Sequence, residues 1–219
     1  MFGSSSIVRS TILNKKELAH LIHHGRLHIT KSKSLSLSLV VPVSTNRESE
    51  SIKKKLNLVE LPGEGGLYRE TYRSSFSTIH TSIQDNNDKK SQDNKRSSAT
   101  LIYYLLGGHS HFSALHKLKS DEIWHFYKGS PVTIYIIDNK GHLTRLKLGN
   151  NIDQDEQCHA IIKAGLWFGA RVDDQSSFAL IGCTVTPGFD YRDFELGRRS
   201  SLIDMFPQHK SIIVSLTRE

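Results

Sequence analysis

The chain has 219 residues and a mass of 24.7 kDa, and 37% of its residues are hydrophobic, which is enough for one domain with a buried core. Its two cysteines, Cys158 and Cys183, exclude a disulfide-stapled scaffold and a zinc site of four cysteines. No stretch approaches the roughly 20 apolar residues of a membrane span, so we expect no membrane partner.

The net charge of +7 is concentrated toward the N-terminus. Residues 1–50 carry seven Lys or Arg and three Glu, whereas residues 151–219 carry seven basic and ten acidic residues. The basic stretch is Ser-rich and lacks the clustered cations with interleaved aromatic residues that are typical of a nucleic-acid-binding face. We therefore expect no nucleic-acid partner.

Residues 1–44 are predicted to be a disordered, basic, Ser-rich extension. Within it, residues 14–24 have the apolar spacing of a short amphipathic helix. The composition resembles a mitochondrial presequence, although Glu17 and the low density of Arg count against one. The expected location is the cytoplasm, with the mitochondrion as the alternative.

A helix is predicted to begin at Ser44-Thr45, because Thr45 and Glu48 have the spacing of a capping box, and to end at Pro62-Gly63. From Leu67 onward the pattern predicts short strands, over residues 67–73, 99–106, 112–117, 122–127, 132–138, 142–148, 159–162, 167–172, 178–185 and 212–216.

Residues 77–98 are polar and repetitive, and we expect them to be a disordered loop insertion. Residues 45–219 are therefore expected to form one domain. Many short strands with almost no helix between them predict an all-β sandwich or barrel.

A metal-binding pattern can be aligned in two ways between Gly108 and Gly129. Jelly-roll barrels bind Fe, Mn, Ni or Zn through a His-x-His pair that is followed by a Glu and a Gly. His109 and His111 form a literal His-x-His pair, but Glu122 follows eleven residues after His111.

The second alignment starts at His116. It gives the expected spacing from Glu122 to Gly129, but it places Leu118 where the second His would stand. The two alignments make different predictions about which histidine belongs to the site.

Five motifs in order resemble the cupin superfamily, specifically the Cupin family 5 group, formerly a domain of unknown function. They are residues 64–73 (EGGLYRETYR), 112–116 (FSALH), 120–129 (SDEIWHFYKG), 164–168 (AGLWF) and 182–190 (GCTVTPGFD). The resemblance covers about residues 52–219. It implies an RmlC-like jelly roll (a double-stranded β-helix), a small-molecule pocket inside the barrel and usually a homodimer, but no particular reaction.

Two positions depart from the pattern of metal-binding cupins, which take two His and a Glu from the first motif and a final His from the second. Here Leu118 and Phe168 stand at two of those positions, so His116 and Glu122 remain. Two protein ligands are fewer than a stable site usually has. We therefore expect a pocket without metal or other cofactor.

His116 and Glu122 are the candidate catalytic pair, because a carboxylate can hold an imidazole in one tautomer and raise its basicity. The same pair is a candidate anchor for a ligand hydroxyl. Trp124, on the same strand face as Glu122, and Trp167 are candidate pocket walls. Arg69 is the candidate contact at the mouth for a carboxylate or phosphate, although either alternating set of its strand can face inward.

The favoured function is binding of a small sugar-like or nucleotide-like molecule. The first alternative is a sugar-derivative isomerase or epimerase in which His116 is the base and Glu122 orients it; the resemblance to the cupin superfamily suggests this, because sugar-nucleotide epimerases of that superfamily use such proton abstraction. The second alternative is a barrel that serves assembly and binds no ligand.

Overall fold

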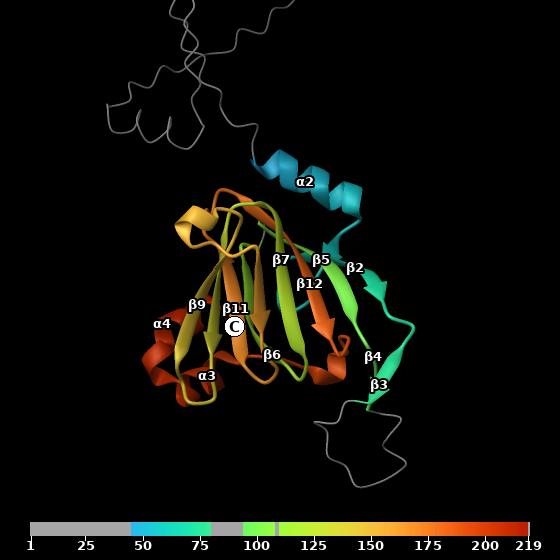
Figure 1. Cartoon of the computed structure of the whole chain (residues 1–219). Coiled ribbons are helices and arrows are strands. Elements are labelled where there is room, and N and C mark those ends of the chain that lie inside the picture. The colour runs from blue at the N-terminus through green and yellow to red at the C-terminus, as the bar shows by residue number, and fades with distance from the viewer. Residues whose placement is uncertain (1–44, 80–93, 108–109, 219) are drawn as a thin grey trace, which may run out of the picture. The chain divides into compact units, whose positions relative to one another are not determined.

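Two β-sheets packed face to face make up most of the folded chain (Figure 1). The structure is a computed structural model that describes residues 45–79, 94–107 and 110–218. The predicted extension over residues 1–44 and its amphipathic helix lie outside the described residues, as do residues 80–93 of the predicted insertion.

The described strands form two large antiparallel sheets and the separate two-stranded sheet of β3 (Ser77–Ile79) and β4 (Lys95–Ser97). One has the order β1 (Val59–Glu60), β2 (Leu67–Arg73), β5 (Thr100–Gly107), β12 (Phe178–Thr186), β7 (Asp121–Gly129) and β10 (His159–Ile162). The other has the order β13 (Phe194–Leu196), β6 (Phe112–Leu118), β11 (Trp167–Val172), β8 (Val132–Ile137) and β9 (Leu143–Leu148). The sheets stay separate and do not close into one continuous ladder, so the predicted all-β jelly roll is confirmed as an open, two-layered form.

Alternation along the strands fills the space between the sheets with large side chains. Tyr104, Trp124 and Phe168 are each at most 1% exposed and belong to one cluster with aliphatic residues of both sheets. Their rings meet edge to face, with centroids 5.8 Å apart for Tyr104 and Trp124 and 6.1 Å apart for Trp124 and Phe168. These contacts are the ones expected when inward-facing residues of two sheets interdigitate.

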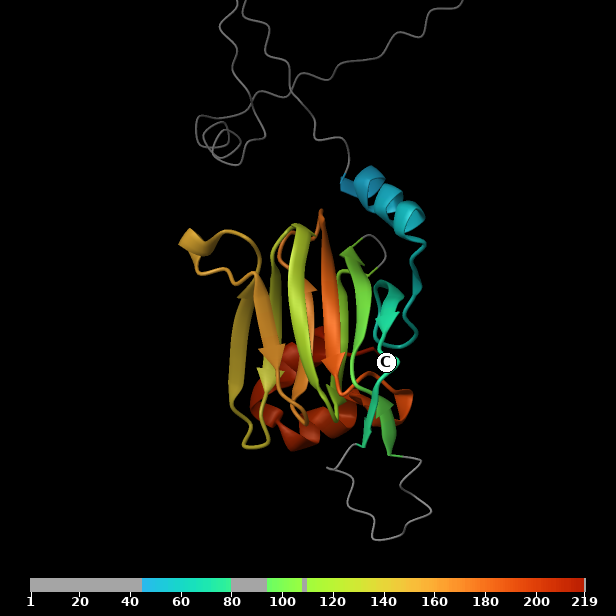
Figure 2. The same cartoon turned by 45° about the vertical axis from the view of Figure 1, so that its right-hand side comes forward.

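The prediction of a strand over residues 212–216 is wrong. Residues 212–215 belong to helix α4 (Lys210–Ser215), and Leu216 is its C-cap. Helix α3 (Arg199–Met205), which was not predicted, precedes it. The β-branched run favours a strand locally, but the helical period brings Ile213 and Leu216 onto one face, where both are fully buried with Trp167. The two helices thus cover the outer face of the five-stranded sheet (Figure 2).

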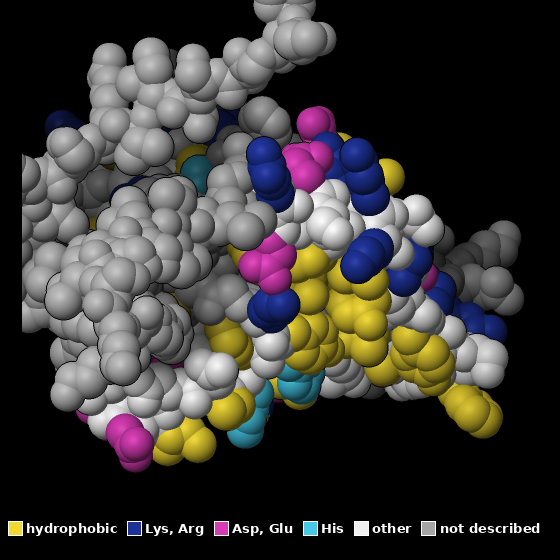
Figure 3. All heavy atoms as spheres, turned by 90° about the horizontal axis from the view of Figure 1, so that it is seen from above, with side chains coloured by type: hydrophobic (Ala, Val, Ile, Leu, Met, Phe, Trp, Pro, Cys, Tyr) yellow, Lys and Arg dark blue, Asp and Glu magenta, His cyan; other side chains and the backbone are white. Residues whose placement is uncertain are grey.

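Helix α2 (Thr45–Leu56) begins at the predicted residue but ends before the predicted Pro62-Gly63. Asn57 takes a left-handed conformation (φ 50°), and the Leu58 N–H donates to the Lys53 carbonyl at 3.0 Å, which closes the helix C-terminus. Ile52 and Leu56 pack on the upper end of the six-stranded sheet. Viewed from above, this end shows clustered hydrophobic side chains bordered by Lys and Arg (Figure 3).

The prediction of a disordered loop over residues 77–98 is wrong at both of its ends. Strand β3 (Ser77–Ile79) pairs with β4 (Lys95–Ser97). Arg96 of β4 is 4% exposed, and its guanidinium donates to the two carboxylate oxygens of Asp193 at 2.6 and 3.0 Å. The sequence pattern did not predict β4, because its buried residue, Arg96, is polar and is stabilised by an ion pair and not by apolar contacts.

Three short 3₁₀ helices complete the described elements: η2 (Ile152–Gln154), η3 (Tyr191–Asp193) and η4 (Pro207–His209). None of the helices in the described part of the chain has the length and apolar character needed to cross a bilayer.

The helical assignment of residues 210–215 predicts unequal effects at two neighbouring positions. Ile213→Ala should lower the free energy of unfolding by about 2–4 kcal/mol, because it removes a fully buried side chain. Val214→Ala, at a position that is 42% exposed, should change it by less than about 0.5 kcal/mol. Urea denaturation measures both values, and a larger loss at Val214 would contradict the helix.

Candidate functional site

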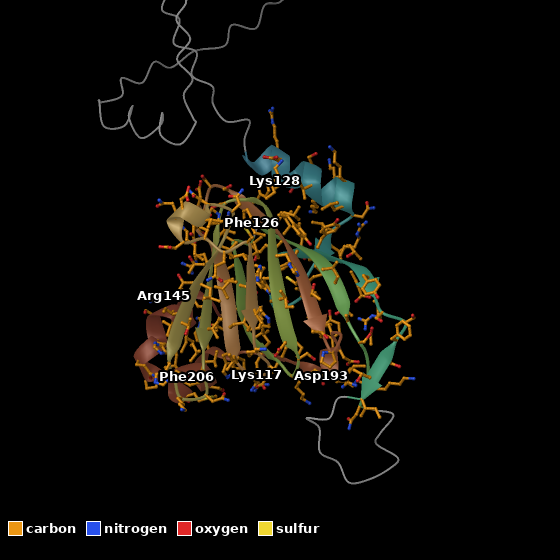
Figure 4. The ribbon with its side chains drawn as sticks, viewed as in Figure 1. Lys117, Phe126, Lys128, Arg145, Asp193 and Phe206 are labelled. Carbon is orange, nitrogen blue, oxygen red and sulfur yellow. The ribbon has the colours of Figure 1, made fainter. Side chains whose placement is uncertain are left out.

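A cavity of about 330 Å³ lies between the sheets, at the end where β6 and β12 finish and β7 begins. Figure 4 labels Lys117 and Asp193 at this end of the molecule. The polar residues of the lining are Glu64, Tyr68, Glu70, Arg73, Thr100, Tyr104, His116, Glu122, Cys183, Asp190 and Tyr191. The apolar residues of the lining are Leu61, Pro62, Ile102, Leu118, Val185, Phe189 and Phe194.

His116 and Glu122 lie together at this cavity, as the sequence predicts. The His116 ring is 2% exposed, and its Nδ1–H donates to the Ala114 carbonyl at 2.8 Å. Its Nε2 is 4.0 Å from a carboxylate oxygen of Glu122, which is an ion-pair distance and too long for a hydrogen bond. The rings of Phe168 and Phe194 pack against the His116 ring, with their centroids 4.1 and 5.4 Å from its centroid.

A third titratable residue, Glu64, belongs to the site and was not predicted as a site residue. It is 8% exposed, and its carboxyl group accepts a hydrogen bond from the Ser113 hydroxyl at 2.7 Å. Burial raises the pKa of Glu64, and the charge of Glu122 adds to this while that of His116 opposes it. The available sequence signal was a lone acid between Pro62-Gly63 and Gly65-Gly66, in a loop that no strand pattern explains.

The charge on His116 follows from its two acidic neighbours. Burial favours the neutral ring, but the negative charges of Glu64 and Glu122 outweigh it and raise the pKa of His116 from 6.5 to about 9. At pH 7 the ring is therefore an imidazolium. A protonated ring donates hydrogen bonds or a proton but cannot take one up, which disfavours the predicted role of His116 as a base.

Arg69 does not line the cavity, contrary to expectation. Its guanidinium carbon lies 5.8 Å from the centre of the Tyr103 ring. The register of β2 against β5 shifts between Glu70 and Tyr72, and this irregularity breaks the simple alternation. As a result Arg73 lines the cavity, on the same side as Glu70.

Arg73 is paired with an acidic residue at the cavity. It donates to both carboxylate oxygens of Glu70, at 2.9 and 2.7 Å, and to the Phe189 carbonyl at 3.2 Å. The positive charge at the mouth is thus neutralised by a residue of the same strand.

Neither predicted tryptophan wall lines the cavity. Trp124 faces the interior on the same side as Glu122, but it is completely buried in the core between Tyr104 and Phe168. Trp167 faces the opposite way and packs under α3 and α4. The aromatic side chains of the lining are Tyr68 of β2 and Tyr104 of β5, together with Phe189, Tyr191 and Phe194 from the segment after β12.

The residues at the metal-ligand positions do not fit a metal ion. Leu118 lines the cavity where the second His would stand, and Phe168 packs its ring on His116. Within residues 45–79, 94–107 and 110–218, no group of three or more His, Cys, Asp or Glu is arranged to hold a metal. His109, the first residue of the literal His-x-His pair, lies outside the described residues.

We expect purified protein to contain far less than one metal ion per chain, because only His116 and Glu122 remain of the usual ligand set. Elemental analysis by ICP-MS measures the content, and prolonged treatment with EDTA should leave the melting temperature unchanged. A content near one metal per chain, together with a lower melting temperature after EDTA, would overturn this conclusion.

The raised pKa of His116 predicts a loss of stability at alkaline pH. The bound proton stabilises the fold fully below pH 6.5, and this contribution disappears as the pH rises through about 9. Its size is on the order of 3 kcal/mol. The raised pKa of Glu64 acts in the same direction, from its ordinary value of 4.5 upward.

His116→Gln should therefore flatten the dependence of the free energy of unfolding on pH between 6.5 and 9. The control His142→Gln removes an exposed imidazole, whose side chain is 74% accessible, and should keep the wild-type dependence. Urea denaturation at several pH values gives the curves. Parallel curves for wild type and His116→Gln would show that His116 does not carry the effect.

The chain is similar to known proteins in sequence and in structure. A solved structure of protein SO0799 from Shewanella oneidensis matches with 34% identity and a TM-score of 0.65, over 77% of this chain and 96% of that chain. A hypothetical protein from Leishmania major matches with 32% identity and a TM-score of 0.67, over 78% of this chain and 98% of that chain.

The protein YML079W of Saccharomyces cerevisiae is 26% identical over 133 residues, which is 59% of this chain and 66% of the yeast protein, just under two thirds of its length. The family model described as Cupin superfamily (DUF985) matches residues 50–197, which include both sheets and every predicted site residue. The chain therefore belongs to the cupin superfamily, in the DUF985 family.

Proposed function

We propose that the protein binds a small, polyhydroxylated, sugar-like molecule in the cavity between its sheets, without a metal. The observation that carries this proposal is the His116 imidazolium beside the carboxyl groups of Glu64 and Glu122, with Phe194 stacked on it. Carboxylates accept hydrogen bonds from hydroxyl groups and the imidazolium donates them, while an aromatic face packs against the C–H face of a sugar ring.

The charges of the cavity favour a sugar over a nucleotide. Among the described residues that line it, only Arg73 and His116 are cationic. Arg73 is occupied by Glu70, and His116 lies between two acidic residues. A phosphate group would therefore meet carboxylates without an available cation, which is unfavourable in a partly buried site.

The size of the cavity also fits a small ligand. A volume of about 330 Å³ is at the lower end of the range for small-molecule sites, roughly 300–1,000 Å³. This leaves room for one sugar unit and little more.

We favour binding over epimerisation with His116 as the base, because abstraction of a proton next to a carbonyl needs a base that does not already hold the proton. With its pKa near 9, the His116 ring holds its proton at pH 7. The homodimer that the family resemblance implies stays a prediction, as does the alternative in which the fold serves assembly only.

Binding can be tested with free monosaccharides and their phosphorylated counterparts, by titration calorimetry and by the NMR signals of the His116 ring. At least one free sugar should bind and shift these signals, and its phosphate should bind more weakly. Glu122→Gln should weaken that binding by about 1–3 kcal/mol, because the charged acceptor is lost. Glu195→Gln, at an exposed position paired with Lys117, is the matched control and should leave binding unchanged.

Tighter binding of phosphorylated compounds would overturn the proposed ligand class. If no compound of either set binds or perturbs His116, the assembly alternative gains. Mass spectrometry of molecules that co-purify with the native protein gives an independent identification.

A further inference from the structure

The C-terminal segment after α4 returns to the candidate site and is firmly held on the way. The Leu216 carbonyl accepts a hydrogen bond from the Leu115 N–H at 2.7 Å, next to the strand position of His116. Thr217 is 4% exposed, and its hydroxyl and carbonyl oxygens accept hydrogen bonds from the Arg199 guanidinium at 3.0 and 2.7 Å. The position of the next residue, Arg218, is thereby fixed.

Arg218 forms hydrogen bonds with the backbone of the loop that carries Glu64. Its Nε donates to the Gly63 carbonyl at 3.1 Å, and its Nη2 lies 3.4 Å from the Glu64 carbonyl and 3.0 Å from the Ser110 hydroxyl. The guanidinium carbon lies 4.5 Å from the centre of the Phe112 ring and makes a cation–π contact with it. One side chain thus joins the C-terminus, the loop and the start of β6.

Gly65 shows how closely this contact is fitted. Its φ of +98° favours glycine, and a Cβ atom there would collide with the Arg218 guanidinium and the Ser110 hydroxyl. The loop passes so near to Arg218 that no side chain fits between them.

Removal of Arg218 would leave the loop with room to move. The loop separates the main cavity from a second cavity of about 350 Å³, which is lined by Gly63, Gly65, Gly66 and Arg218, among others. The second cavity lies on the side of the loop away from His116, because Glu64 alone of residues 63–66 lines the main cavity. A shift of the loop into that space would carry the Glu64 carboxyl group away from His116.

We propose that Arg218 is a positioning residue of the site, which acts through Glu64: by holding the Gly63 and Glu64 carbonyls, it fixes the Glu64 carboxyl group beside the His116 ring. Glu64 is also held by the Ser113 hydroxyl, which donates to its carboxyl group at 2.7 Å, and by the Ala114 N–H, which donates to its carbonyl at 2.9 Å. Its own N–H donates to the Pro62 carbonyl at 2.9 Å. The first two contacts come from β6 and the third from the loop itself, so Arg218 adds the contact from the C-terminal segment.

The direction of the pKa change at His116 separates this role from a simple charge effect. Loss of the Arg218 positive charge alone would make the surroundings more negative and raise the pKa of His116. Displacement of Glu64 would remove the largest influence that favours the protonated ring and lower that pKa. Glu122, Tyr104 and Cys183 are other titratable groups near the ring, and the Tyr104 hydroxyl donates to the Gly65 carbonyl of the same loop at 2.8 Å.

The experiment measures the pKa of His116 by NMR titration of its ring signals in full-length variants, without any ligand. Arg218→Ala should lower it by about 0.5–1 unit. Arg218→Lys keeps the charge but loses the planar fork that reaches two acceptors, and it should lower the pKa as well. Arg145→Ala, at an exposed position on β9 away from the cavity, is the matched control and should leave the pKa unchanged.

A double-mutant cycle tests whether Arg218 acts through Glu64. Glu64→Gln should lower the pKa of His116 further than Arg218→Ala does, and adding Arg218→Ala to Glu64→Gln should lower it no more. A rise or no change in Arg218→Ala, or full additivity in the double variant, would overturn the proposal. If Arg218→Ala does not fold, Arg218→Lys decides the matter by the same criterion. The outcome is separate from the proposed function, since sugar binding could fail while the cycle succeeds, and the reverse.

Discussion

The buried imidazolium of His116 between Glu64 and Glu122 is the interaction on which the site depends. A charge in this position is stable only if acidic groups compensate for the lost contact with water. The ring and its two acidic neighbours come from three places in the chain: Glu64 from the loop before β2, His116 from the end of β6 and Glu122 from the start of β7. The fold brings them together because β6 and β7 are joined by a short turn yet lie in opposite sheets, so the cavity between the sheets receives side chains from both.

The sequence was sufficient to predict the positions of most strands and the central pair of His116 and Glu122. Alternating patterns located nine strands, and the motif around Glu122 indicated His116 as its neighbour. These predictions succeeded because they depend on a period of two residues and on short spacings, which tertiary contacts seldom override.

Predictions were wrong where one extra residue in a strand interrupts the alternation of side chains, or where a segment distant in the sequence determines which residues are buried. Tyr68 and Glu70 face the cavity, so Arg69 between them faces away, and the register shift after Glu70 then brings Arg73 to the cavity; no local pattern reveals such a shift. Trp167 was predicted to line the pocket because the helices that cover its face lie more than thirty residues later in the chain; α3 was not predicted, and the residues of α4 were predicted as a strand. Glu64 was missed because its burial results from the loop's contact with β6 and the C-terminus.

The ion pair between Arg96 and Asp193 limits how this family member can change in length. Asp193 lies in the segment that supplies Phe189, Tyr191 and Phe194 to the cavity, and the Gly188 N–H and the Thr186 hydroxyl of the same segment bond to the carbonyls of Ser97 and Ser98. The β3–β4 arm therefore supports the aromatic side of the cavity from outside. The polar stretch over residues 77–98 looks dispensable in sequence, but it ends in β4, which carries Arg96. We therefore expect that an insertion or deletion in this stretch leaves the site intact only if it lies before Arg96 in the chain.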